Sequence, residues 1–504
     1  MPNVAQAAWE HARTHPDRIA LRGTAGAWTY GVLRERSAVY TGALVAAGVR
    51  PGDRVLLCAP SVPEFVAVYL AVQAAGAIVV TVNTMATRPE IEYMLKDAGC
   101  RLAVGWHGNG PAAADAAAAA GVPLWTLEPG AQATGGTAIN RVHQASHDDT
   151  AAILYTSGTT GRPKGAQLTT GNLLACAETF TAALELTSED RSGTALPLYH
   201  VFGQAVVMGS ALRAGAAVSL LPRFEAEAML AMLRDDRLTV MFGVPTMWNA
   251  MLHASEGADA VGFADLRLAA SGGAPLPAEV LRAFTVRFGC VILEGYGLTE
   301  TTGVATFNGL RRRRKPGFVG PALDGCELEI RRPVGTVCRP DEVGEIFLRG
   351  PAVMKGYWNR PEETAAALKD GWLKTGDLGA RDAAGDVRIV DRLKDLIIRG
   401  GYNVYPGEVE EVLYTHPDIV DAAVIGVPDD HYGEEVAAVI VLRPGARMDA
   451  AGLRVWAKEK LSAYKVPRLV GFVAALPKGP SGKVLKRAID RDSLRAPATV
   501  RTGS

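Results

Sequence analysis

The sequence Tyr155-Thr156-Ser157-Gly158-Thr159-Thr160-Gly161-Arg162-Pro163-Lys164-Gly165 directly follows the apolar run 151–154. An apolar run that enters a loop rich in glycine and hydroxyl groups predicts a β-strand ending in a phosphate-binding turn. Glycines let backbone N–H groups converge on an anion, hydroxyls donate further hydrogen bonds, and a lysine adds positive charge. The loop departs from the Walker pattern, because Pro163 replaces its second glycine and Gly165 replaces its magnesium-binding hydroxyl. The stretch therefore predicts a phosphate loop of another kind.

The composition is that of a folded protein with balanced charge. Its 504 residues are 48% apolar and 21% charged, and 53 lysines and arginines balance 53 acidic residues. This length predicts roughly three domain-sized units. Zero formal net charge gives no general attraction for nucleic acid or anionic membranes, so we expect neither as a partner. The six cysteines are scattered without a CxxC pair, which argues against a zinc site or disulfide framework and fits a reducing cytosol.

Neither the N-terminus nor the most apolar stretch predicts export or membrane insertion. Residues 1–10 lack the basic segment and apolar core of a secretory signal. Residues 65–82 are long enough to resemble a membrane span, but Glu64 precedes them, Gln73 interrupts them and Gly76 stands where a helix would end. We therefore expect a buried helix of about twelve residues that leads into a strand at 78–82, in a cytoplasmic protein without an integral membrane segment.

Alternating helical and strand-like segments predict a multidomain α/β fold. Residues 1–145 and 150–306 follow this alternation, which is typical of parallel sheets with crossover helices. Residues 326–331 and 345–350 alternate apolar and polar side chains, which is typical of an antiparallel sheet with one face in water. We expect a large N-terminal domain (1–391) of two α/β sheet subdomains plus a small antiparallel β subdomain. A hinge (392–396) and a mobile small α/β domain (397–504) would follow.

Three loops are expected at the carboxyl ends of strands, where ligands of open α/β sheets bind. They cover residues 156–165, 271–275 and 294–301, each directly after an apolar run. One ligand could contact all three loops.

Seven motifs extend this interpretation over nearly the whole chain. They are YTSGTTGRPKG (155–165), PLYHVFG (197–203), SGGAPL (271–276), EGYGLTETT (294–302), KTGDLG (374–379), DRLKDLIIRGGYNVYPGEVE (391–410) and PKGPSGKVLKR (477–487). In these motifs and their order the chain resembles the adenylate-forming enzymes: acyl-CoA synthetases, firefly-type luciferases and peptide-synthetase adenylation domains. One motif alone is weak evidence, whereas seven in the family's order are specific. The resemblance implies an acid–thiol ligase that uses ATP with Mg²⁺ to make an acyl-adenylate and pyrophosphate. The ligase then passes the acyl group to a thiol such as CoA and releases AMP.

The resemblance also implies how the nucleotide is bound. Glu300 resembles the Mg²⁺ ligand, a hard carboxylate for a hard cation, and Thr299 a donor to the α-phosphate. The β- and γ-phosphates would be held by Thr156, Ser157, Gly158, Thr159, Thr160, Gly161 and Lys164. Adenine would lie against Gly273, Ala274, Gly295 and Tyr296, and the ribose would contact Asp377 and Arg392.

Residues near the C-terminus are implied to separate the two half-reactions. Lys483 resembles the lysine that bridges the attacking carboxylate and the phosphate in adenylation only, and losing such a donor typically costs about 10²–10³ in rate. The small domain must then alternate between two positions, with the hinge at Lys394. Gly400 and Gly401 would line the tunnel for the CoA thiol. Relatives further suggest a lysine acyltransferase or deacylase acting on Lys483, and a homodimer is left open.

The acyl site is predicted to be apolar. Its candidate walls are Gly203, Val207, Met208, Met241 and Gly272, together with Gly295. A histidine in an apolar run is more often a core residue, but the motif around His200 implies a place near the carboxylate or the thiol entrance. Amino-acid-activating relatives carry an aspartate after this motif, and residues 201–208 contain none, so an unpaired ammonium would be costly there.

Other charged groups carry less information. The run 311–315 could meet the CoA phosphates, although a solvated loop explains it equally well. The acidic residues Glu408, Glu410 and Glu411 are expected to form the exposed face of a helix.

Several activities are compatible with the motifs. The closing motif favours a medium- or long-chain fatty acid as substrate. The alternatives are an aryl- or dicarboxylate-CoA ligase, such as a coumarate- or malonate-type enzyme, and an enzyme that loads a carrier protein. The lack of an appended carrier domain weakly favours free CoA. An inactive binding protein should have lost Glu300 or Lys483, and a conventional NTPase would release phosphate instead of pyrophosphate.

Overall fold

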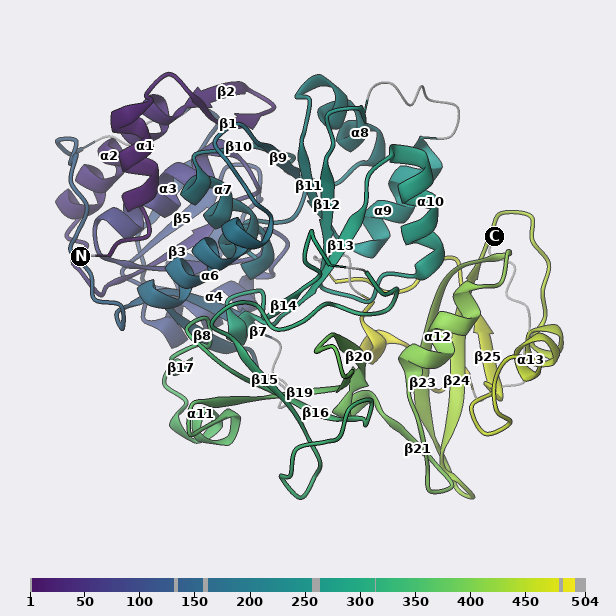
Figure 1. Cartoon of the computed structure of the whole chain (residues 1–504). Coiled ribbons are helices and arrows are strands. Elements are labelled where there is room, and N and C mark those ends of the chain that lie inside the picture. The colour runs from purple at the N-terminus through teal and green to yellow at the C-terminus, as the bar shows by residue number, and fades with distance from the viewer. Residues whose placement is uncertain are drawn as a thin grey trace. The chain divides into compact units, whose positions relative to one another are not determined.

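The computed structural model describes residues 2–130, 135–156, 162–255, 263–312, 314–479 and 484–494, and its chain forms two compact units (Figure 1). The larger unit comprises Met1–Leu276, Val280–Leu328 and Leu348–Lys374, and the smaller one Pro277–Glu279, Glu329–Phe347 and Thr375–Ser504. The predicted α/β fold class, with a large N-terminal and a small C-terminal part, is confirmed. The boundary after residue 391 and the hinge at 392–396 stay predictions.

A seven-stranded sheet in the larger unit carries the phosphate loop. Its order is β17-β8-β7-β4-β3-β5-β6. The parallel strands are β3 (Arg54–Cys58), β4 (Ile78–Thr81), β5 (Leu102–Trp106), β6 (Leu124–Leu127) and β7 (Thr150–Thr156), and antiparallel β8 (Lys164–Thr169) and β17 (Gly356–Tyr357) complete one edge. Because Thr156 pairs with Lys164, the phosphate loop connects the two strands of the β7–β8 hairpin.

The helices that precede β3, β4, β5 and β6 in the sequence follow their local sequences. They are α2 (Tyr30–Ala46), α3 (Pro63–Ala74), α4 (Arg88–Ala98) and α5 (Ala112–Ala120). The Thr29 hydroxyl caps α2 by accepting a hydrogen bond from the Val32 N–H, and α4 ends at Gly99 in the left-handed conformation. Every residue of α3 is buried, which explains its apolar sequence and confirms the predicted buried helix. Within the described residues, no helix has the length and apolar character needed to cross a membrane.

An eight-stranded sheet forms the second α/β layer of the larger unit, in the order β14-β13-β12-β11-β9-β10-β1-β2. Its strands are β1 (Ile19–Gly23), β2 (Gly26–Thr29), β9 (Arg191–Thr194), β10 (Ala217–Leu220), β11 (Val240–Gly243), β12 (Leu268–Ser271), β13 (Ile292–Tyr296) and β14 (Thr306–Phe307). The strand β13 therefore continues through Tyr296, into the stretch 294–301 that was predicted as a loop. The first and second α/β segments of the sequence also exchange strands, since β1 pairs with β10 and β4 pairs with β7.

Further helices of the larger unit come from segments that lie far apart in the sequence. They are α1 (Gln6–Thr14), α6 (Thr170–Ala183), the π-helix η1 (Phe202–Gly209), α7 (Ser210–Ala214), α8 (Ala226–Asp235), α9 (Pro245–Ala254) and α10 (Ala278–Phe288). The teal helices α8, α9 and α10 lie beside β11–β13 (Figure 1), where Met241, Trp248 and Phe284 belong to one buried cluster.

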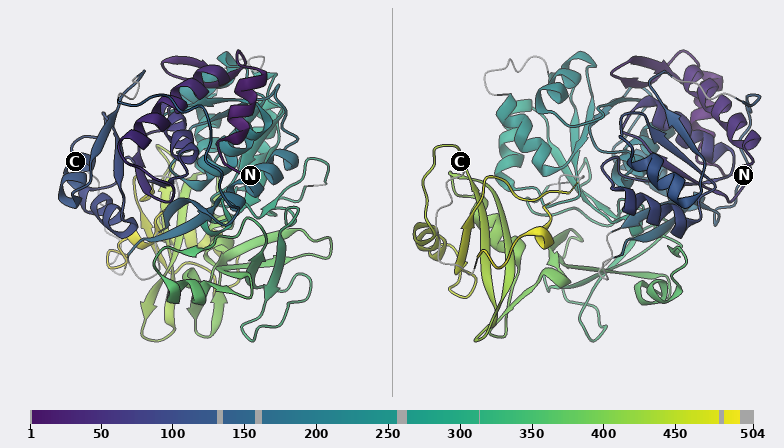
Figure 2. Two further views of the ribbon diagram at one scale, coloured as in Figure 1. Left: turned by 90° about the vertical axis from the view of Figure 1, so that its left-hand side faces the viewer. Right: turned by 180° about the vertical axis from the view of Figure 1, so that it is seen from behind.

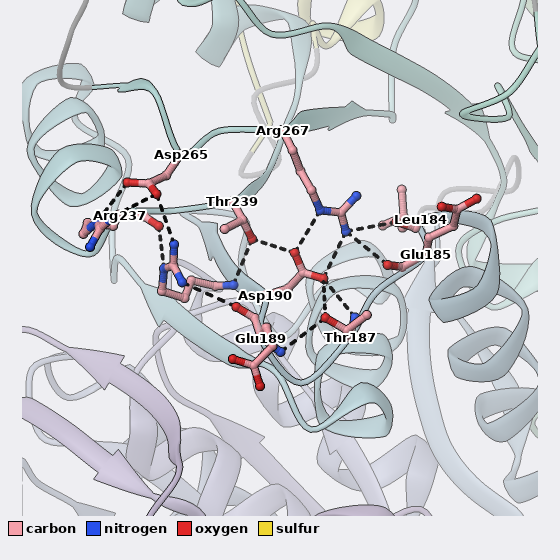
Figure 3. A network of polar contacts seen from close by, with 10 residues as sticks. Leu184, Glu185, Thr187, Glu189, Asp190, Arg237, Thr239, Asp265 and Arg267 are labelled. Carbon is pink, nitrogen blue, oxygen red and sulfur yellow. Dashed lines mark hydrogen bonds and ion pairs between the residues drawn. The ribbon is translucent and has the colours of Figure 1, made fainter.

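A buried polar network fixes the amino ends of β9, β11 and β12 (Figure 3). Asp190, just before β9, accepts hydrogen bonds from the Thr239 hydroxyl (2.7 Å), the Arg267 Nε (2.9 Å) and the Thr187 N–H (2.9 Å). Burial would raise the pKa of the Asp190 carboxyl, but these donors together hold it below its ordinary value. Thr239 precedes β11 and Arg267 precedes β12. The Asp190 carboxylate therefore links the residues directly before β9, β11 and β12.

Two further sheets follow. The third has the order β15-β16-β19-β18, with β20 beside β19. Its strands are β15 (Glu327–Arg331), β16 (Gly344–Arg349), β18 (Leu368–Lys369), β19 (Trp372–Arg381) and β20 (Val387–Arg392). Burial alternates along β15 and β16, as expected for strands with one covered face, and β18 and β20 each pair antiparallel with β19. The short helix α11 (Pro361–Ala367) lies between β17 and β18 in the sequence.

The C-terminal part of the smaller unit forms the fourth sheet, β22-β21-β24-β23 with β25 beside β24. The strands are β21 (Ile397–Arg399), β22 (Tyr402–Val404), β23 (Ile419–Asp429), β24 (Gly433–Leu442) and β25 (Leu469–Phe472), and the helices are α12 (Pro406–Tyr414) and α13 (Ala450–Lys458). The β23–β24 hairpin is the long yellow-green ribbon of Figure 2. Val409 and Leu413 of α12 pack against Val424 and Val436 of this hairpin.

One prediction for α12 is wrong. Glu410 was expected on its exposed face, but its Oε1 accepts a hydrogen bond from the Val424 N–H (2.7 Å) and pairs with Lys486 Nζ (2.8 Å). Burial raises the pKa of the Glu410 carboxyl, while Lys486 acts in the opposite direction. Glu408, in contrast, is half-exposed and pairs with Lys465.

Candidate active site

The two ends of the phosphate loop lie in the described part of the chain and pack against neighbouring side chains. Ser157, Gly158, Thr159, Thr160 and Gly161 lie outside the described residues, as does Lys483. At the far end, a Cβ on Gly165 would lie 2.6 Å from Ile153 Cγ2 and 3.3 Å from the Tyr155 ring. The position therefore requires glycine, which explains why this loop lacks the hydroxyl residue that the Walker pattern has after its lysine.

Helix α4 binds both ends of the loop. The Tyr155 hydroxyl donates to Asp97 Oδ2 (2.7 Å), and the Tyr93 hydroxyl donates to the Pro163 carbonyl (3.0 Å). Desolvation, followed by the hydrogen bond to Asp97, raises the pKa of Tyr155, so this hydroxyl remains a neutral donor. Sequence reasoning did not identify Tyr93 or Asp97, because no local pattern connects a helix at 88–98 with a loop sixty residues later.

Glu300 and Lys164 approach the same aromatic side chain. Tyr357 of β17 donates its hydroxyl hydrogen bond to Glu300 Oε1 (2.9 Å), and Lys164 Nζ lies 5.4 Å from the centroid of the Tyr357 ring. Burial, reinforced by the Glu300 charge, raises the pKa of Tyr357. Thr299 and Glu300 belong to the short 3₁₀ turn η3 (Thr299–Thr301), which the Met354 N–H fixes by donating to the Glu300 carbonyl (2.9 Å). Tyr357 is thus a site residue that the sequence analysis missed.

The donor set suits a magnesium ion that arrives with a nucleotide. Among the described residues, no group of three or more histidine, cysteine, aspartate and glutamate side chains could hold a metal by itself. Mg²⁺ typically keeps several waters and takes one or two carboxylates plus substrate phosphates. A single half-buried carboxylate, Glu300, beside the phosphate loop fits that mode of binding.

The expected adenine slot is assembled by two neighbouring strands. Ser271 at the end of β12 pairs with Glu294 of β13, and a Cβ on Gly272 would lie 3.5 Å from the Gly295 carbonyl oxygen. Gly273, which precedes Ala274, has a positive φ of 81°. The Leu276 N–H donates a hydrogen bond to Glu294 Oε2 (3.3 Å). The structure therefore brings Gly272 next to Gly295 at the carboxyl edge of the sheet.

The candidate acyl-site residues are distributed over two regions. His200 is half-buried, and its Nδ1 accepts a hydrogen bond from the Phe202 N–H (3.2 Å) at the start of η1. A Cβ on Gly203 would lie 2.4 Å from the Pro197 carbonyl oxygen, and one on Gly272 would lie 3.3 Å from the Phe202 ring. The Phe202 ring therefore lies beside Gly272.

The larger candidates are core residues in this structure. Val207 and Met208 of η1 are 0% and 2% exposed in the main hydrophobic cluster, whereas Met241 is 0% exposed in the separate cluster beneath α8–α10. A Cβ on Gly303 would lie 2.8 Å from Val206 Cγ2, so η1 also packs against the turn that follows Glu300. π-helical turns occur frequently at functional sites.

The remaining predicted residues lie in the smaller unit. Asp377 and Arg392 are register partners of β19 and β20, and Arg392 Nε lies 3.3 Å from Asp377 Oδ1. Lys394 lies in the 3₁₀ turn η4 (Leu393–Asp395). Gly400 and Gly401 join β21 to β22 with positive φ angles of 57° and 83°. A two-residue hairpin turn with positive φ at both positions strongly favours glycine, so local geometry also explains this pair.

Comparisons with known proteins place the chain among CoA ligases. The family described as AMP-binding enzyme matches residues 8–358, and AMP-binding enzyme C-terminal domain matches residues 408–483. A feruloyl-CoA synthase of an Amycolatopsis species is 38% identical over 498 residues, covering 97% of this chain and 99% of its own. A long-chain-fatty-acid–CoA ligase of Bacillus subtilis (strain 168) is 35% identical over 519 residues, covering 95% and 92%. The crystal structure of ATP-bound MatB from Rhodopseudomonas palustris has a TM-score of 0.87 at 36% identity, covering 96% of this chain and 98% of that one.

Proposed function

Because the chain belongs to the family of AMP-binding enzymes and is an acid–thiol ligase of the CoA-ligase type, we propose that it works in two half-reactions. The oxygen of a carboxylate attacks the α-phosphorus of ATP, the bond to the β-phosphate breaks, and acyl-adenylate and pyrophosphate form. The CoA thiol then attacks the acyl carbon, so that the thioester forms and AMP leaves.

The arrangement of Glu300, Tyr357 and Lys164 supports the first half-reaction best. Attack on a polyanionic nucleotide requires that its charge be neutralised first. Lys164 and the loop 156–161 would hold the β- and γ-phosphates, and Thr299 would donate to the α-phosphate. Glu300 would hold Mg²⁺, which supplies further positive charge when bound with ATP. Since the Tyr357 hydroxyl occupies Glu300 Oε1 (2.9 Å), it would orient the second carboxylate oxygen toward the ion.

The other nucleotide contacts are proposed for each unit separately. In the larger unit, adenine would lie against Gly273, Ala274, Gly295 and Tyr296. In the smaller unit, Asp377 would accept hydrogen bonds from the ribose hydroxyls, with Arg392 on the same sugar.

The second half-reaction is assigned to the smaller unit. Lys483 would hold the carboxylate and the α-phosphate during adenylation, and rotation at Lys394 would replace it with the Gly400–Gly401 turn beside the thiol. His200 would lie near the carboxylate or the thiol entrance. Lys483→Ala should then abolish adenylation while thioester formation from supplied acyl-adenylate survives. Equal loss of both activities would contradict this division of roles.

The acid is proposed to be an aryl acid of the ferulate kind. The feruloyl-CoA synthase is 38% identical over nearly the full length of both chains, and Phe202 places an aromatic ring directly beside Gly272. A medium- or long-chain fatty acid, which the sequence analysis favoured, is the second candidate, because the Bacillus subtilis ligase is 35% identical. Of the predicted walls, Gly203 and Gly272 are kept in this proposal, whereas Val207, Met208 and Met241 lie in the hydrophobic core.

A panel of acids tests both levels of the proposal. Purified enzyme should exchange labelled pyrophosphate into ATP only when a suitable acid is present, and should form a thioester once CoA is added. Ferulate and coumarate should exceed octanoate and palmitate in kcat/KM if the aryl assignment holds; the reverse order would establish the fatty acid. Cleavage of ATP to ADP without exchange would overturn the whole reaction scheme.

Two further predictions attach to this function. We propose a cytoplasmic location and leave a homodimer open. A lysine acyltransferase would silence Lys483 by removing its charge. An acylated protein that retained full adenylation would contradict this form of regulation.

A further inference from the structure

A pocket of about 330 Å³ adjoins the carboxyl end of the phosphate loop. Its walls are Arg162, Pro163, Lys164, Arg360 and Glu363. Three cations therefore face one carboxylate. In the described part of the chain, neither Arg162 nor Lys164 forms an ion pair, so this pocket has an excess of positive charge.

Arg360 is held in this wall by groups that also hold the phosphate loop. Its Nη2 donates to Asp97 Oδ1 (2.7 Å) and to the Tyr93 hydroxyl (3.2 Å), while Nη1 donates to the Asn359 carbonyl (3.1 Å). Tyr93 in turn donates to the Pro163 carbonyl (3.0 Å). One hydroxyl thus connects the Arg360 guanidinium to the loop backbone at Pro163.

The guanidinium retains capacity for a further anion. A guanidinium carries five N–H donors, and the bonds to Asp97, Tyr93 and Asn359 use three of them. The Nε atom lies 4.0 Å from Glu363 Oε1, which is an ion-pair distance but too long for a hydrogen bond. The Arg360 side chain is 31% exposed, so an anion can reach it from solvent.

The charge balance remains positive when the carboxylate behind the wall is included. The Asp97 side chain is only 11% exposed and already accepts from both Arg360 and Tyr155. Asp97 and Glu363 together offset two of the three cations. A ligand with several negative charges would therefore be attracted, whereas a single carboxylate would gain little.

We propose that this pocket binds pyrophosphate and that Arg360 donates hydrogen bonds to it on the side of α4 and α11. The inference rests on the proposed function, because adenylation generates pyrophosphate beside Lys164. Arg360 and Arg162 would receive the leaving group and hold it apart from the acyl-adenylate. The phosphates of CoA have the same chemistry, and the experiment separates the two sources.

Direct titration of the ligand-free enzyme tests the pocket. Inorganic pyrophosphate and adenosine 3′,5′-bisphosphate, which carries the nucleotide phosphates of CoA, are titrated separately by calorimetry. Losing charge-assisted hydrogen bonds typically weakens binding by roughly tenfold to a hundredfold. Arg360→Gln should raise the pyrophosphate Kd by at least about tenfold. Arg360→Lys should restore part of the lost affinity, because lysine retains the charge but lacks the planar set of donors of a guanidinium.

Two companion variants separate binding from structure. Glu363→Gln leaves the Arg360–Asp97 bond intact, and it should tighten pyrophosphate binding by about twofold to fivefold because a repulsive charge is removed. Arg237→Gln is the matched control: this arginine is exposed and paired with Asp265, and its loss should leave the Kd unchanged.

The outcomes are distinct. A pyrophosphate Kd that changes by less than about twofold in both Arg360→Gln and Glu363→Gln would overturn the pocket, as would a tenfold effect on the bisphosphate with none on pyrophosphate. These results would leave the ligase intact, since the parent enzyme would still exchange pyrophosphate into ATP. Absence of exchange in the parent enzyme would instead refute the proposed function.

Discussion

Two polar clusters of the larger unit are built from arginine and carboxylate side chains but differ in role. One stabilises the fold, and the other is proposed to bind an anion. The Asp190 network lies at the amino ends of β9, β11 and β12, and its carboxylate, 7% exposed, is surrounded by donors (Figure 3). The pocket beside the phosphate loop lies past the carboxyl end of β7, and two of its three cations lack an ion-pair partner among the described residues. A saturated buried network stabilises the fold. An incompletely balanced, half-exposed cluster is free to bind an anion.

This comparison predicts that substitutions in the two regions change different measurable properties of the enzyme. Changes at the phosphate-loop edge should alter turnover or ligand binding while the unfolding temperature stays constant. Changes in the Asp190 network should lower the unfolding temperature while activity per folded molecule stays constant. A substitution that altered both equally would break the distinction.

The largest effect is expected for Glu300→Gln. The amide retains an acceptor for the Tyr357 hydroxyl but loses the charge that would hold Mg²⁺, so the adenylation rate should fall by about 10²–10³. Pyrophosphate exchange at saturating ATP measures it, and the Tm should match that of the parent. A loss below about tenfold would remove Glu300 from the metal-binding role.

Asp190→Asn should cost about 2 kcal/mol of stability, because charge-assisted hydrogen bonds from Arg267 lose their ionic partner. The predicted result is a Tm lower by several degrees with unchanged kcat at 25 °C. Scanning calorimetry and the thioester assay measure the two quantities. An unchanged Tm would show that Arg267 finds equivalent acceptors in the carbonyls of Leu184 and Glu185, to which it also donates.

The same carboxylate predicts a pH dependence. The pKa of Asp190 is lower in the folded protein than its ordinary value, so its contribution to stability is complete above about pH 4. That contribution should be lost as the pH falls through the lowered native value. The difference in Tm between the parent and Asp190→Asn should therefore shrink on acidification, and a constant difference would contradict the linkage.

Tyr357→Phe is expected to have a smaller effect on the other side of the comparison. Phenylalanine preserves the ring beside Lys164 but removes the hydrogen bond that orients Glu300. We expect the Mg²⁺ concentration for half-maximal exchange to rise about tenfold, with a smaller change in kcat at saturating Mg²⁺. An equal fall in kcat at all Mg²⁺ concentrations would indicate a structural role instead.

The smallest effect is expected for Arg237→Gln. Arg237 pairs with Asp265 at the exposed margin of the Asp190 network, where its side chain is 72% exposed. Solvent screens such a pair, so the Tm should change by less than about 2 °C. A larger change would show that the network extends further toward the surface than the buried contacts of Asp190 indicate.

Much of the fold could be predicted from local sequence. The apolar run at 65–82 forms α3 and β4 because Gly76, with a φ of 74°, ends the helix. The alternating stretches at 326–331 and 345–350 form half-covered strands. The apolar run 151–154 likewise forms part of β7, since such features are properties of short segments. The phosphate-binding role of the loop that follows it stays a prediction.

Contacts between distant segments could not be predicted. Nothing near residue 155 indicates that Tyr93 and Asp97 bind the loop or that Tyr357 joins Glu300 to Lys164. Nor does the sequence around β1 indicate that this strand pairs with β10 as well as with its neighbour β2. Glu410 was misassigned for the same reason: helical spacing gave its position in α12, but the Val424 N–H and Lys486 that surround it come from elsewhere.

The sequence alone therefore determined the elements, the motifs and the type of chemistry, because propensity, glycine geometry and side-chain charge act over a few residues. Only the tertiary structure decided which charges are neutralised and which remain available. Asp190 and Arg360 are each an ordinary ionisable residue in the sequence. Their neighbours, brought from segments far apart, make one a structural link between strands and leave the other with donors for an anion.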